Sequence, residues 1–189
     1  SNSALEGLRF YHGSGSDLTP MSRCGRLIAT GSNDKEAMVW EAKSGRVVKR
    51  LKGHTGAVLG VAFSADSTRL VSGSRDGSLA VWAVPSGVPL GTCPVAHSKG
   101  VTCVDFEPGG TVASGGKDGC VKIWRVTPGG SISLLHSLLA HSAEINAVSF
   151  SPDGRSLASG SDDCSAKIWD AEKGALLLTT PRPQPACLG

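Results

Sequence analysis

The sequence predicts an all-β protein built from a repeated unit, and three observations support this prediction. Glycine makes up 25 of the 189 residues, and short apolar segments alternate with turn-forming residues. Trp40, Trp82, Trp124 and Trp169 recur at intervals of 42, 42 and 45 residues. The segments between them, such as VLGVAF and RLVSGS, are short and rich in β-branched residues. Each repeat is therefore expected to hold several short antiparallel strands.

The repeats share polar and glycine positions upstream of each tryptophan. A glycine lies nine residues before the tryptophan, a hydroxyl residue precedes that glycine, and an aspartate follows it by three residues. Three repeats also begin with a histidine, which is followed by an aliphatic residue at +4, valine at +7 and phenylalanine at +9. The complete sets are His54, Ser72, Asp76, Trp82; His97, Ser114, Asp118, Trp124; and His141, Ser159, Asp163, Trp169.

These shared positions resemble those of the WD-repeat family, whose histidine and Trp-Asp signatures recur every 40–45 residues or so. The last unit matches best, because its tryptophan is followed by Asp170. The resemblance covers residues 26–179 and implies a β-propeller with blades of four antiparallel strands. We expect a partial propeller with three complete blades and one incomplete blade. The expected parts are an irregular leader (1–25), units at about 26–52, 53–95, 96–139 and 140–179, and a proline-rich mobile tail (180–189).

The first unit poses a separate question, because His12 lies at the histidine interval from the later positions of that unit. The places where inner-strand side chains are expected hold Ser16, Thr19 and Met21, of which only Met21 could pack. We therefore expect His12 in an irregular leader and a first blade without its inner strand. A closed ring of four blades would need that strand. The sequence thus favours a fragment or truncated isoform of a larger propeller, with assembly with a second copy as the alternative.

The recurring Ser, His and Asp could suggest a hydrolase, but their positions favour a structural role. The histidine precedes the inner strand and the aspartate follows the second strand, so both lie at the same end of a blade. We expect the aspartate to accept a hydrogen bond from the histidine ring. The serine hydroxyl would meet the other ring nitrogen and accept from the indole N–H. Three copies of an active site in one small domain would be unusual, whereas three copies of a structural network are expected in a repeat protein. A hydrolase is therefore the disfavoured alternative.

The loop tips at this end of the blades differ between repeats and are therefore the expected recognition surface. Their mixed charge would suit a partner with both signs, or an acidic peptide over Arg75, Lys99 and Lys117. The sequence predicts a non-catalytic protein–protein interaction scaffold within an intracellular complex. The candidate partner-binding residues are Asn33, Arg75, Lys99, Lys117, Glu144 and Asp162.

Composition excludes several other functions. The net charge of +3 is too small to indicate nucleic acid or a membrane as the partner. Five basic residues between Lys43 and Lys52 leave RNA or DNA binding, as in a ribonucleoprotein component, as an alternative. No aromatic set accompanies them for stacking, so that alternative is disfavoured. The six cysteines form no CxxC pair and no zinc-like spacing, which predicts no metal or cofactor and a reducing compartment, cytoplasmic or nuclear.

Overall fold

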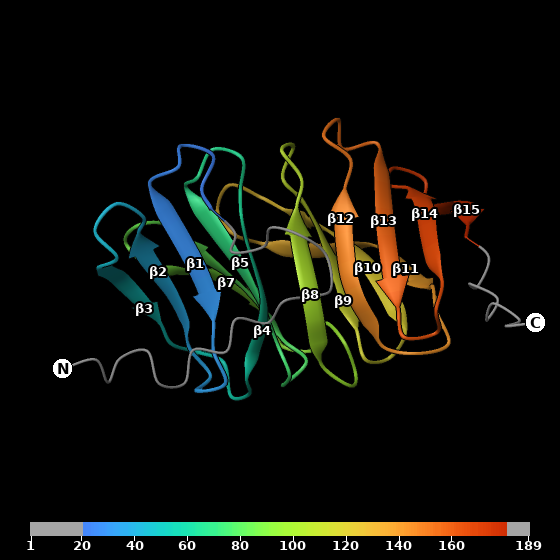
Figure 1. The fold of residues 1–189 in the computed structure, drawn as a ribbon, viewed down its shortest axis with the longest axis horizontal. Helices are drawn as coiled ribbons and strands as arrows, with labels where there is room; N and C mark the ends of the chain where they lie inside the picture. The colour runs from blue at the N-terminus through green and yellow to red at the C-terminus, as the bar shows by residue number, and fades with distance from the viewer. Residues whose placement is uncertain (1–20, 181–189) are drawn as a thin grey trace, which may run out of the picture.

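The computed structural model describes residues 21–180, and within this range it contains strands and turns but no helix. This part of the chain therefore contains no helix that is long and apolar enough to cross a membrane. Fifteen strands form four antiparallel sheets, one of three strands and three of four. The sheets follow one another along the molecule (Figure 1). The prediction of an all-β fold made of antiparallel propeller blades is confirmed, and within residues 21–180 three blades have four strands and one has three.

Each sheet is one blade, and its strands pair in chain order. Blade 1 contains β1 (Leu27–Gly31), β2 (Ala37–Glu41) and β3 (Val47–Leu51). Blade 2 contains β4 (Val58–Phe63), β5 (Arg69–Ser74), β6 (Leu79–Ala83) and β7 (Pro89–Cys93). Blade 3 contains β8 (Val101–Phe106), β9 (Thr111–Gly116), β10 (Cys120–Val126) and β11 (Ile132–Leu139). Blade 4 contains β12 (Ile145–Phe150), β13 (Ser156–Ser161), β14 (Ala166–Asp170) and β15 (Ala175–Thr179).

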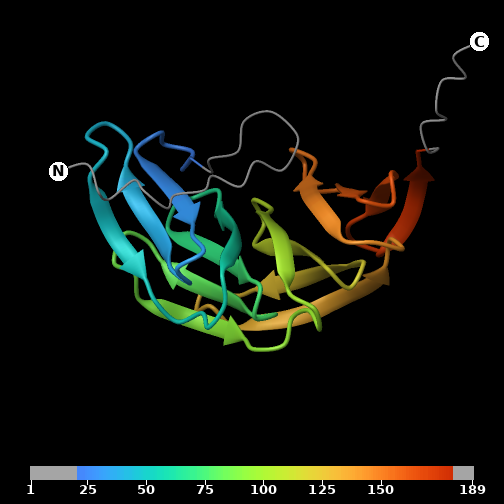
Figure 2. The ribbon, with the colours of Figure 1, turned by 60° about the horizontal axis from the view of Figure 1, so that its bottom comes forward.

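The hydrophobic core lies between blades, because successive side chains of a strand point to opposite faces of its sheet. In blade 2, Leu70 and Trp82 pack toward blade 1, whereas Val71 and Val81 pack toward blade 3. A third cluster joins blades 3 and 4. We call the face toward the next blade in chain order the leading face, and the opposite one the trailing face. The blades together follow an arc (Figure 2).

The repeated glycine allows neighbouring blades to approach closely. A Cβ atom at Gly73 would lie 2.5 Å from Cγ1 of Val101, which belongs to the inner strand of the next blade. The same atom at Gly115 would lie 2.6 Å from Cγ2 of Ile145. In blade 4, by contrast, a Cβ at Gly160 would meet no atom of residues 21–180 within 4 Å. The glycine is therefore sterically required only where another inner strand follows.

The first described residues bear on the inner strand that the sequence predicts to be absent from blade 1. Met21 forms an isolated antiparallel bridge with Ile28. In blade 2, Phe63 pairs with Leu70 at the same place in the repeat, so Met21 occupies the position of that phenylalanine. Met21 is 55% exposed. His12, the rest of the expected leader before Met21 and the tail beyond residue 180 lie outside the described residues, and the unit boundaries remain predictions.

Candidate binding face

The polar network of blade 3 connects the four residues that the repeat pattern singled out. Oγ of Ser114 lies 2.8 Å from Nε2 of His97 and accepts a 2.8 Å hydrogen bond from the indole N–H of Trp124. Nδ1 of His97 lies 2.9 Å from Oδ1 of Asp118. Because the carboxylate can only accept, the ring donates from Nδ1 to Asp118, and Nε2 of the neutral ring accepts the O–H of Ser114, whose oxygen accepts from the indole.

Blade 2 contains a fifth member that the sequence reasoning missed. Nδ1 of His54 lies 2.8 Å from Oγ of Ser78, whereas it is 3.6 Å from Oδ2 of Asp76. Ser78 bridges His54 and Asp76, because its hydroxyl donates to Oδ1 of Asp76 over 2.6 Å. The signal was present in the sequence as a hydroxyl residue two positions after the aspartate, repeated at Ser165. In blade 3 that position holds Cys120, and the histidine contacts the aspartate directly.

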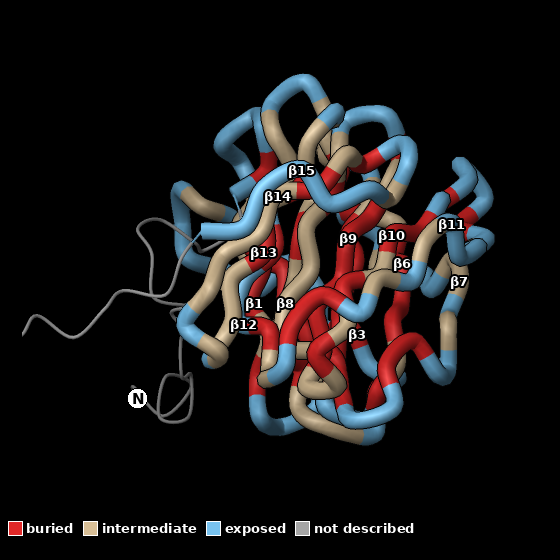
Figure 3. Tube along the Cα trace, turned by 90° about the vertical axis from the view of Figure 1, so that its right-hand side faces the viewer, coloured by how far each residue is buried: buried red, intermediate tan, exposed pale blue. Residues whose placement is uncertain are grey.

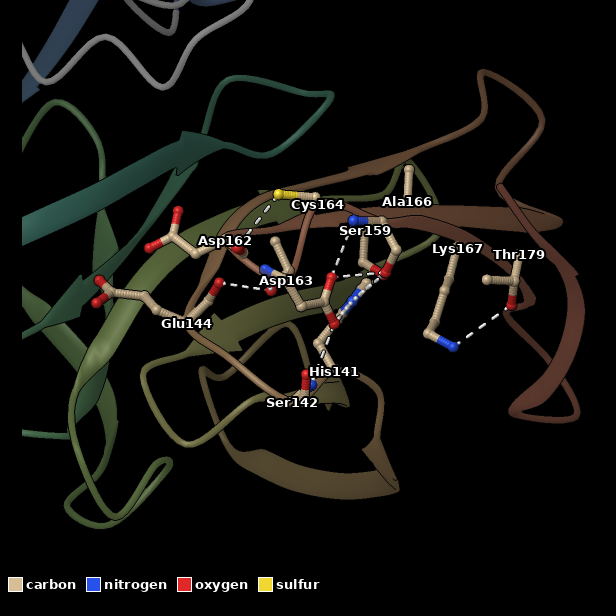
Figure 4. Close-up of polar contacts among 12 residues, drawn as sticks. His141, Ser142, Glu144, Ser159, Asp162, Asp163, Cys164, Ala166, Lys167 and Thr179 are labelled. Atoms are coloured by element: carbon tan, nitrogen blue, oxygen red, sulfur yellow. Dashed lines mark hydrogen bonds and ion pairs between the residues drawn. The ribbon is translucent and has the colours of Figure 1, made fainter. Parts of the chain in front are cut away.

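Blade 4 combines both arrangements, as Figure 4 shows around His141. Nδ1 of His141 lies 3.0 Å from Oδ2 of Asp163 and 3.1 Å from Oγ of Ser165. Its Nε2 lies 2.9 Å from Oγ of Ser159. Asp163 also accepts the backbone N–H of Ser142, which fixes the loop that follows the histidine. The networks thus tie the loops at this end of each blade to its core.

In blade 1 the described part of the network is shorter. Oγ1 of Thr30 accepts a 2.9 Å hydrogen bond from the indole N–H of Trp40. Asp34 accepts from the backbone N–H of Glu36 within its own turn. The histidine that the spacing would assign to this set, His12, falls outside the described residues.

The ionisation of these groups follows from their burial and their partners. Burial lowers the pKa of His54 and of His97, and this effect outweighs the attraction of the adjacent carboxylates. Burial alone would raise the pKa of Asp76, but donors on Ser78 and Thr55 outweigh it and hold the pKa well below its usual range. Both histidines are therefore neutral at pH 7 and act as fixed donor–acceptor bridges.

These shifts predict that the protein loses stability in mild acid. The folded-state pKa of His54 and of His97 lies below the ordinary value of 6.5, so the unfolded chain takes up protons first. The stabilisation is complete above that value and is lost as the pH falls toward the folded-state pKa. We expect the free energy of unfolding, and with it the Tm, to fall between about pH 7 and about pH 5, the free energy by at most about 1.4 kcal/mol per pH unit for each histidine.

Thermal unfolding followed by tryptophan fluorescence across this range would measure the effect. The double variant His54→Gln, His97→Gln is the control, because it removes both titrating rings. The variant should start from a lower Tm and show a flatter pH dependence. A wild-type Tm that stays constant from about pH 7 to about pH 5 would contradict neutral buried histidines.

The loop residues proposed for partner binding lie at the same end of the blades as these networks. The backbone N–H of Arg75 donates to the carbonyl of Ala57 over 2.8 Å. The corresponding bonds are those of Lys117 with Gly100 and of Asp162 with Glu144, at 3.1 Å each. Each turn is thus joined to the loop after the histidine of its own blade. We call each set of His, Ser, Asp and Trp a tetrad, and this end of the blades the tetrad face.

The charged side chains of the tetrad face differ in whether they form ion pairs. Nζ of Lys117 lies 3.1 Å from Oε2 of Glu144, so this pair joins blades 3 and 4. Asp162 accepts from the side-chain amide of Asn146. Arg75 and Lys99 are exposed, and among residues 21–180 no ion pair involves either side chain. Asn33 is exposed in the β1–β2 turn and has its own polar contact.

Arg75 and Lys99 lie on adjoining loops of blades 2 and 3. A Cβ at Gly100, the residue after Lys99, would lie 2.9 Å from the carbonyl oxygen of Arg75. Gly100 has a φ of +107°, a conformation that other residues rarely adopt. Close backbone contact therefore holds the two basic residues next to each other.

A second polar feature, absent from the sequence predictions, lies at the opposite ends of the inner strands. Oδ2 of Asp105 accepts the backbone N–H of Phe150 over 2.7 Å, which links β8 to β12. At the other end of β8, near the networks, the hydroxyl of Thr102 donates to the carbonyl oxygen of Ile145 in β12. Burial raises the pKa of Asp105. Blades 3 and 4 are thus joined by side-chain bonds as well as by apolar packing.

The basic segment that kept nucleic-acid binding as an alternative includes β3. Two of its cations are paired with Glu36: Nη1 of Arg50 lies 3.3 Å and Nζ of Lys52 lies 3.1 Å from its carboxylate. Val47 and Val48 between the charges are exposed apolar residues. In the described part of the chain, no group of three or more His, Cys, Asp or Glu residues is placed to hold a metal ion.

Comparison with known proteins identifies the repeat. The family described as WD domain, G-beta repeat (WD40) matches residues 45–83, 87–125 and 132–170. Each matched segment contains the outer strand of one blade and the first three strands of the next. The repeat in the sequence is therefore shifted by one strand relative to the blade in the structure.

Three curated proteins illustrate the similarity. An uncharacterized WD repeat-containing protein of Schizosaccharomyces pombe is 31% identical over 104 residues, covering 54% of this chain and 18% of that protein. Nuclear distribution protein nudF of Aspergillus niger is 34% identical over 89 residues, or 47% and 20% of the two chains. Human apoptotic protease-activating factor 1 is 33% identical over 113 residues, or 55% and 9%.

The chain thus spans one fifth or less of the length of these relatives. The matched WD40 segments nevertheless cover more than half of the chain, and they coincide with its three complete sets of His, Ser, Asp and Trp. Together with the antiparallel blades, these matches show that the protein belongs to the WD40 repeat family.

Proposed function

We propose that this chain is a non-catalytic scaffold that binds an acidic segment of a partner protein on the tetrad face. The observation that carries this proposal is the placement of Arg75 and Lys99, which are exposed, without ion-pair partners among the described residues, and on loops in backbone contact. WD40 repeats as a family act as interaction scaffolds. A rigid face with two adjacent cations suits a peptide segment that carries more than one carboxylate.

The proposed site has a boundary toward blade 4. Lys117 is paired with Glu144, so its charge is largely compensated, and Asp162 adds a carboxylate nearby. An acidic peptide is therefore favoured over blades 2 and 3 and disfavoured over blade 4. We propose that the bound segment carries its acidic residues over Arg75 and Lys99, with a neutral or basic residue toward Asp162.

Burial of the serines supports the non-catalytic part of the proposal. Ser72 and Ser114 are fully buried, and Ser159 is 2% exposed. Each serine oxygen accepts from a tryptophan indole, so none is open to a substrate. An intracellular location, cytoplasmic or nuclear, remains part of the proposal and is supported by the unpaired state of the described cysteines.

Nucleic-acid binding through β3 has less support. Two of the five basic side chains in that segment share the single carboxylate of Glu36, which compensates part of the charge that phosphates would meet.

Fluorescence anisotropy with labelled ten-residue peptide pools would test the proposal. The pools are rich in Glu and Asp, rich in Lys and Arg, or neutral. We expect the acidic pool to bind best, and the double reversal Arg75→Glu, Lys99→Glu to weaken it by about ten-fold or more, because repulsion replaces attraction. A rising salt concentration should also weaken the binding of the acidic pool to the wild-type protein.

The matched control reverses two exposed arginines away from the tetrad face, Arg125→Glu and Arg155→Glu, and changes the net charge equally. This control should keep affinity for the acidic pool within about two-fold. Equal loss in both double variants would show a net-charge effect and contradict a site at Arg75 and Lys99. The absence of preference for the acidic pool would contradict the proposed ligand class.

A further inference from the structure

Three basic residues of the tetrad face surround one buried glycine, Gly100. Lys99 precedes Gly100 in the chain, and a Cβ at Gly100 would lie 3.2 Å from Cα of Arg75. The carbonyl oxygen of Gly100 accepts the backbone N–H of Lys117 over 3.1 Å. We call Arg75, Lys99 and Lys117 the basic cluster. The loops at the ends of the strands are largely exposed while β9 and β10 are largely buried (Figure 3), so the cluster is open to a partner and supported by a packed core.

Comparison of the repeats shows how the basic cluster is limited on one side. Gly100 and Glu144 occupy the same position of the repeat, three residues after the histidine of their tetrads. Each contacts the leading face of the preceding blade, Gly100 at Arg75 of blade 2 and Glu144 at Lys117 of blade 3. Arg75 and Lys117 also correspond, because each precedes the turn aspartate of its blade. The same interblade position thus holds no side chain beside Arg75 and a carboxylate beside Lys117.

The side chain of Glu144 can move while its loop stays in place. Oε2 of Glu144 lies 3.1 Å from Nζ of Lys117, and the two side chains are 32% and 33% exposed. The carbonyl oxygen of Glu144 accepts from the N–H of Asp162 and from the hydroxyl of Ser161, which holds the backbone. The side chain points away from His141 and its tetrad (Figure 4). Rotation of this side chain alone would therefore free Lys117.

We propose that Glu144 competes with the acidic partner segment for Lys117 and thereby selects for segments that carry more than two acidic groups. The inference rests on the proposed binding of such a segment at Arg75 and Lys99. A carboxylate of the ligand and the carboxylate of Glu144 would make the same contact with Lys117. A segment with two acidic groups occupies Arg75 and Lys99, whereas a longer acidic segment gains the third cation only by displacing Glu144.

The size of the effect follows from the exposure of the pair. Charges that are partly exposed to water attract each other weakly, so displacing Glu144 lowers the affinity of a long acidic segment by about two- to five-fold. A longer segment can meet this cost because it regains an equivalent contact with Lys117. Glu144 therefore adjusts the selectivity of the basic cluster without closing it.

Fluorescence anisotropy with two labelled peptides would test the proposal on the whole chain. One peptide is oligoglutamate, which can span the basic cluster, and the other carries a single pair of glutamates in a neutral sequence. Glu144→Gln removes the competing charge and keeps the size of the side chain. We expect this variant to bind oligoglutamate about two- to five-fold more tightly than wild type does. Its affinity for the peptide with two glutamates should stay within about 1.5-fold, because that peptide does not need Lys117.

Two further variants serve as controls. Glu172→Gln changes the net charge equally, and Glu172 is exposed in the β14–β15 turn, at the other end of the blades. This variant should leave the affinity for oligoglutamate within about 1.5-fold of wild type. Glu144→Ala should give the same gain as Glu144→Gln, which excludes a new contact of the amide. Circular dichroism would confirm that all variants fold.

Carbodiimide cross-linking observes the competition directly, because the reagent joins a carboxylate to a neighbouring amine with loss of water. In the free wild-type protein we expect mass spectrometry to find Lys117 linked to Glu144. Saturating oligoglutamate should suppress this link and replace it by one between the peptide and Lys117. The peptide with two glutamates should leave the link between Lys117 and Glu144 in place.

The outcomes separate this inference from the proposed function. If oligoglutamate binds through Arg75 and Lys99 but the link between Lys117 and Glu144 persists at saturation, competition is overturned and the acidic ligand class stands. Weaker binding by Glu144→Gln would also overturn it, because Glu144 would then orient Lys117 for the ligand. If neither peptide binds the wild-type protein, both the proposed function and this inference fall.

Discussion

Replacing Gly115 by alanine should lower the free energy of unfolding by about 1–3 kcal/mol, whereas the same replacement at Gly160 should not lower it. A Cβ at Gly115 would lie 2.6 Å from Cγ2 of Ile145 and 2.7 Å from Sγ of Cys103. Ile145 is fully buried, so its methyl group has nowhere to move. At Gly160 the new methyl group meets open space, and alanine in a strand gains up to about 1 kcal/mol over glycine.

Urea unfolding monitored by tryptophan fluorescence would measure both variants, with m-values compared to exclude changes in the unfolded state. Equal destabilisation at the two positions would show that strand conformation, and not the approaching inner strand, demands glycine. A loss of stability at Gly115 without a loss at Gly160 is therefore specific to the contact with the next blade.

The second large effect is expected at His97. The variant His97→Ala removes a donor from Asp118 and an acceptor from Ser114, each buried or partly buried. We expect it to lower the free energy of unfolding by about 2–4 kcal/mol, because unpaired buried polar groups cost about 1–3 kcal/mol each. His54→Ala should cost less, at about 1–3 kcal/mol, because His54 lies 3.6 Å from Asp76 and loses no direct bond to a carboxylate. Both aspartates keep other donors, from Ser98 and Cys120 in blade 3 and from Thr55 and Ser78 in blade 2.

Urea unfolding under the same conditions would rank the two histidine variants, and a larger loss for His54→Ala would contradict the role assigned to Ser78. A fluorophosphonate probe supplies the complementary chemical test. Because Ser72 is fully buried and bonded to His54 and Trp82, we expect no labelling of the folded protein. Labelling of Ser72 would instead indicate a working serine nucleophile and contradict a structural role for the set.

The repeat made the strands predictable, because periodic positions report the same local environment several times. VLGVAF and RLVSGS were expected as strands and are β4 and β5 with the same limits. Their alternation places one set of side chains toward each neighbouring blade. A single copy would have left helix and strand harder to separate, whereas the recurring glycine, turn and tryptophan positions fixed the register of all four units.

The contacts that differ between blades were not predictable in the same way. Ser78 intervenes between His54 and Asp76, yet in blade 3 cysteine stands at its position and the ring contacts the carboxylate directly. The ion pair of Lys117 with Glu144 depends on side-chain reach across two blades. Such contacts arise from the spatial spacing of loops, which sequence distance does not encode.

The offset between the matched segments and the blades has an evolutionary consequence. Residues 87–125 contain the outer strand of blade 2 and three strands of blade 3. Deleting this segment would join β6 to β11, and the shortened blade would again contain four strands in meander order. Duplication would likewise add one whole blade and leave no strand without a neighbour. Propeller genes can therefore gain or lose repeats in units that never break a hydrogen-bonded sheet.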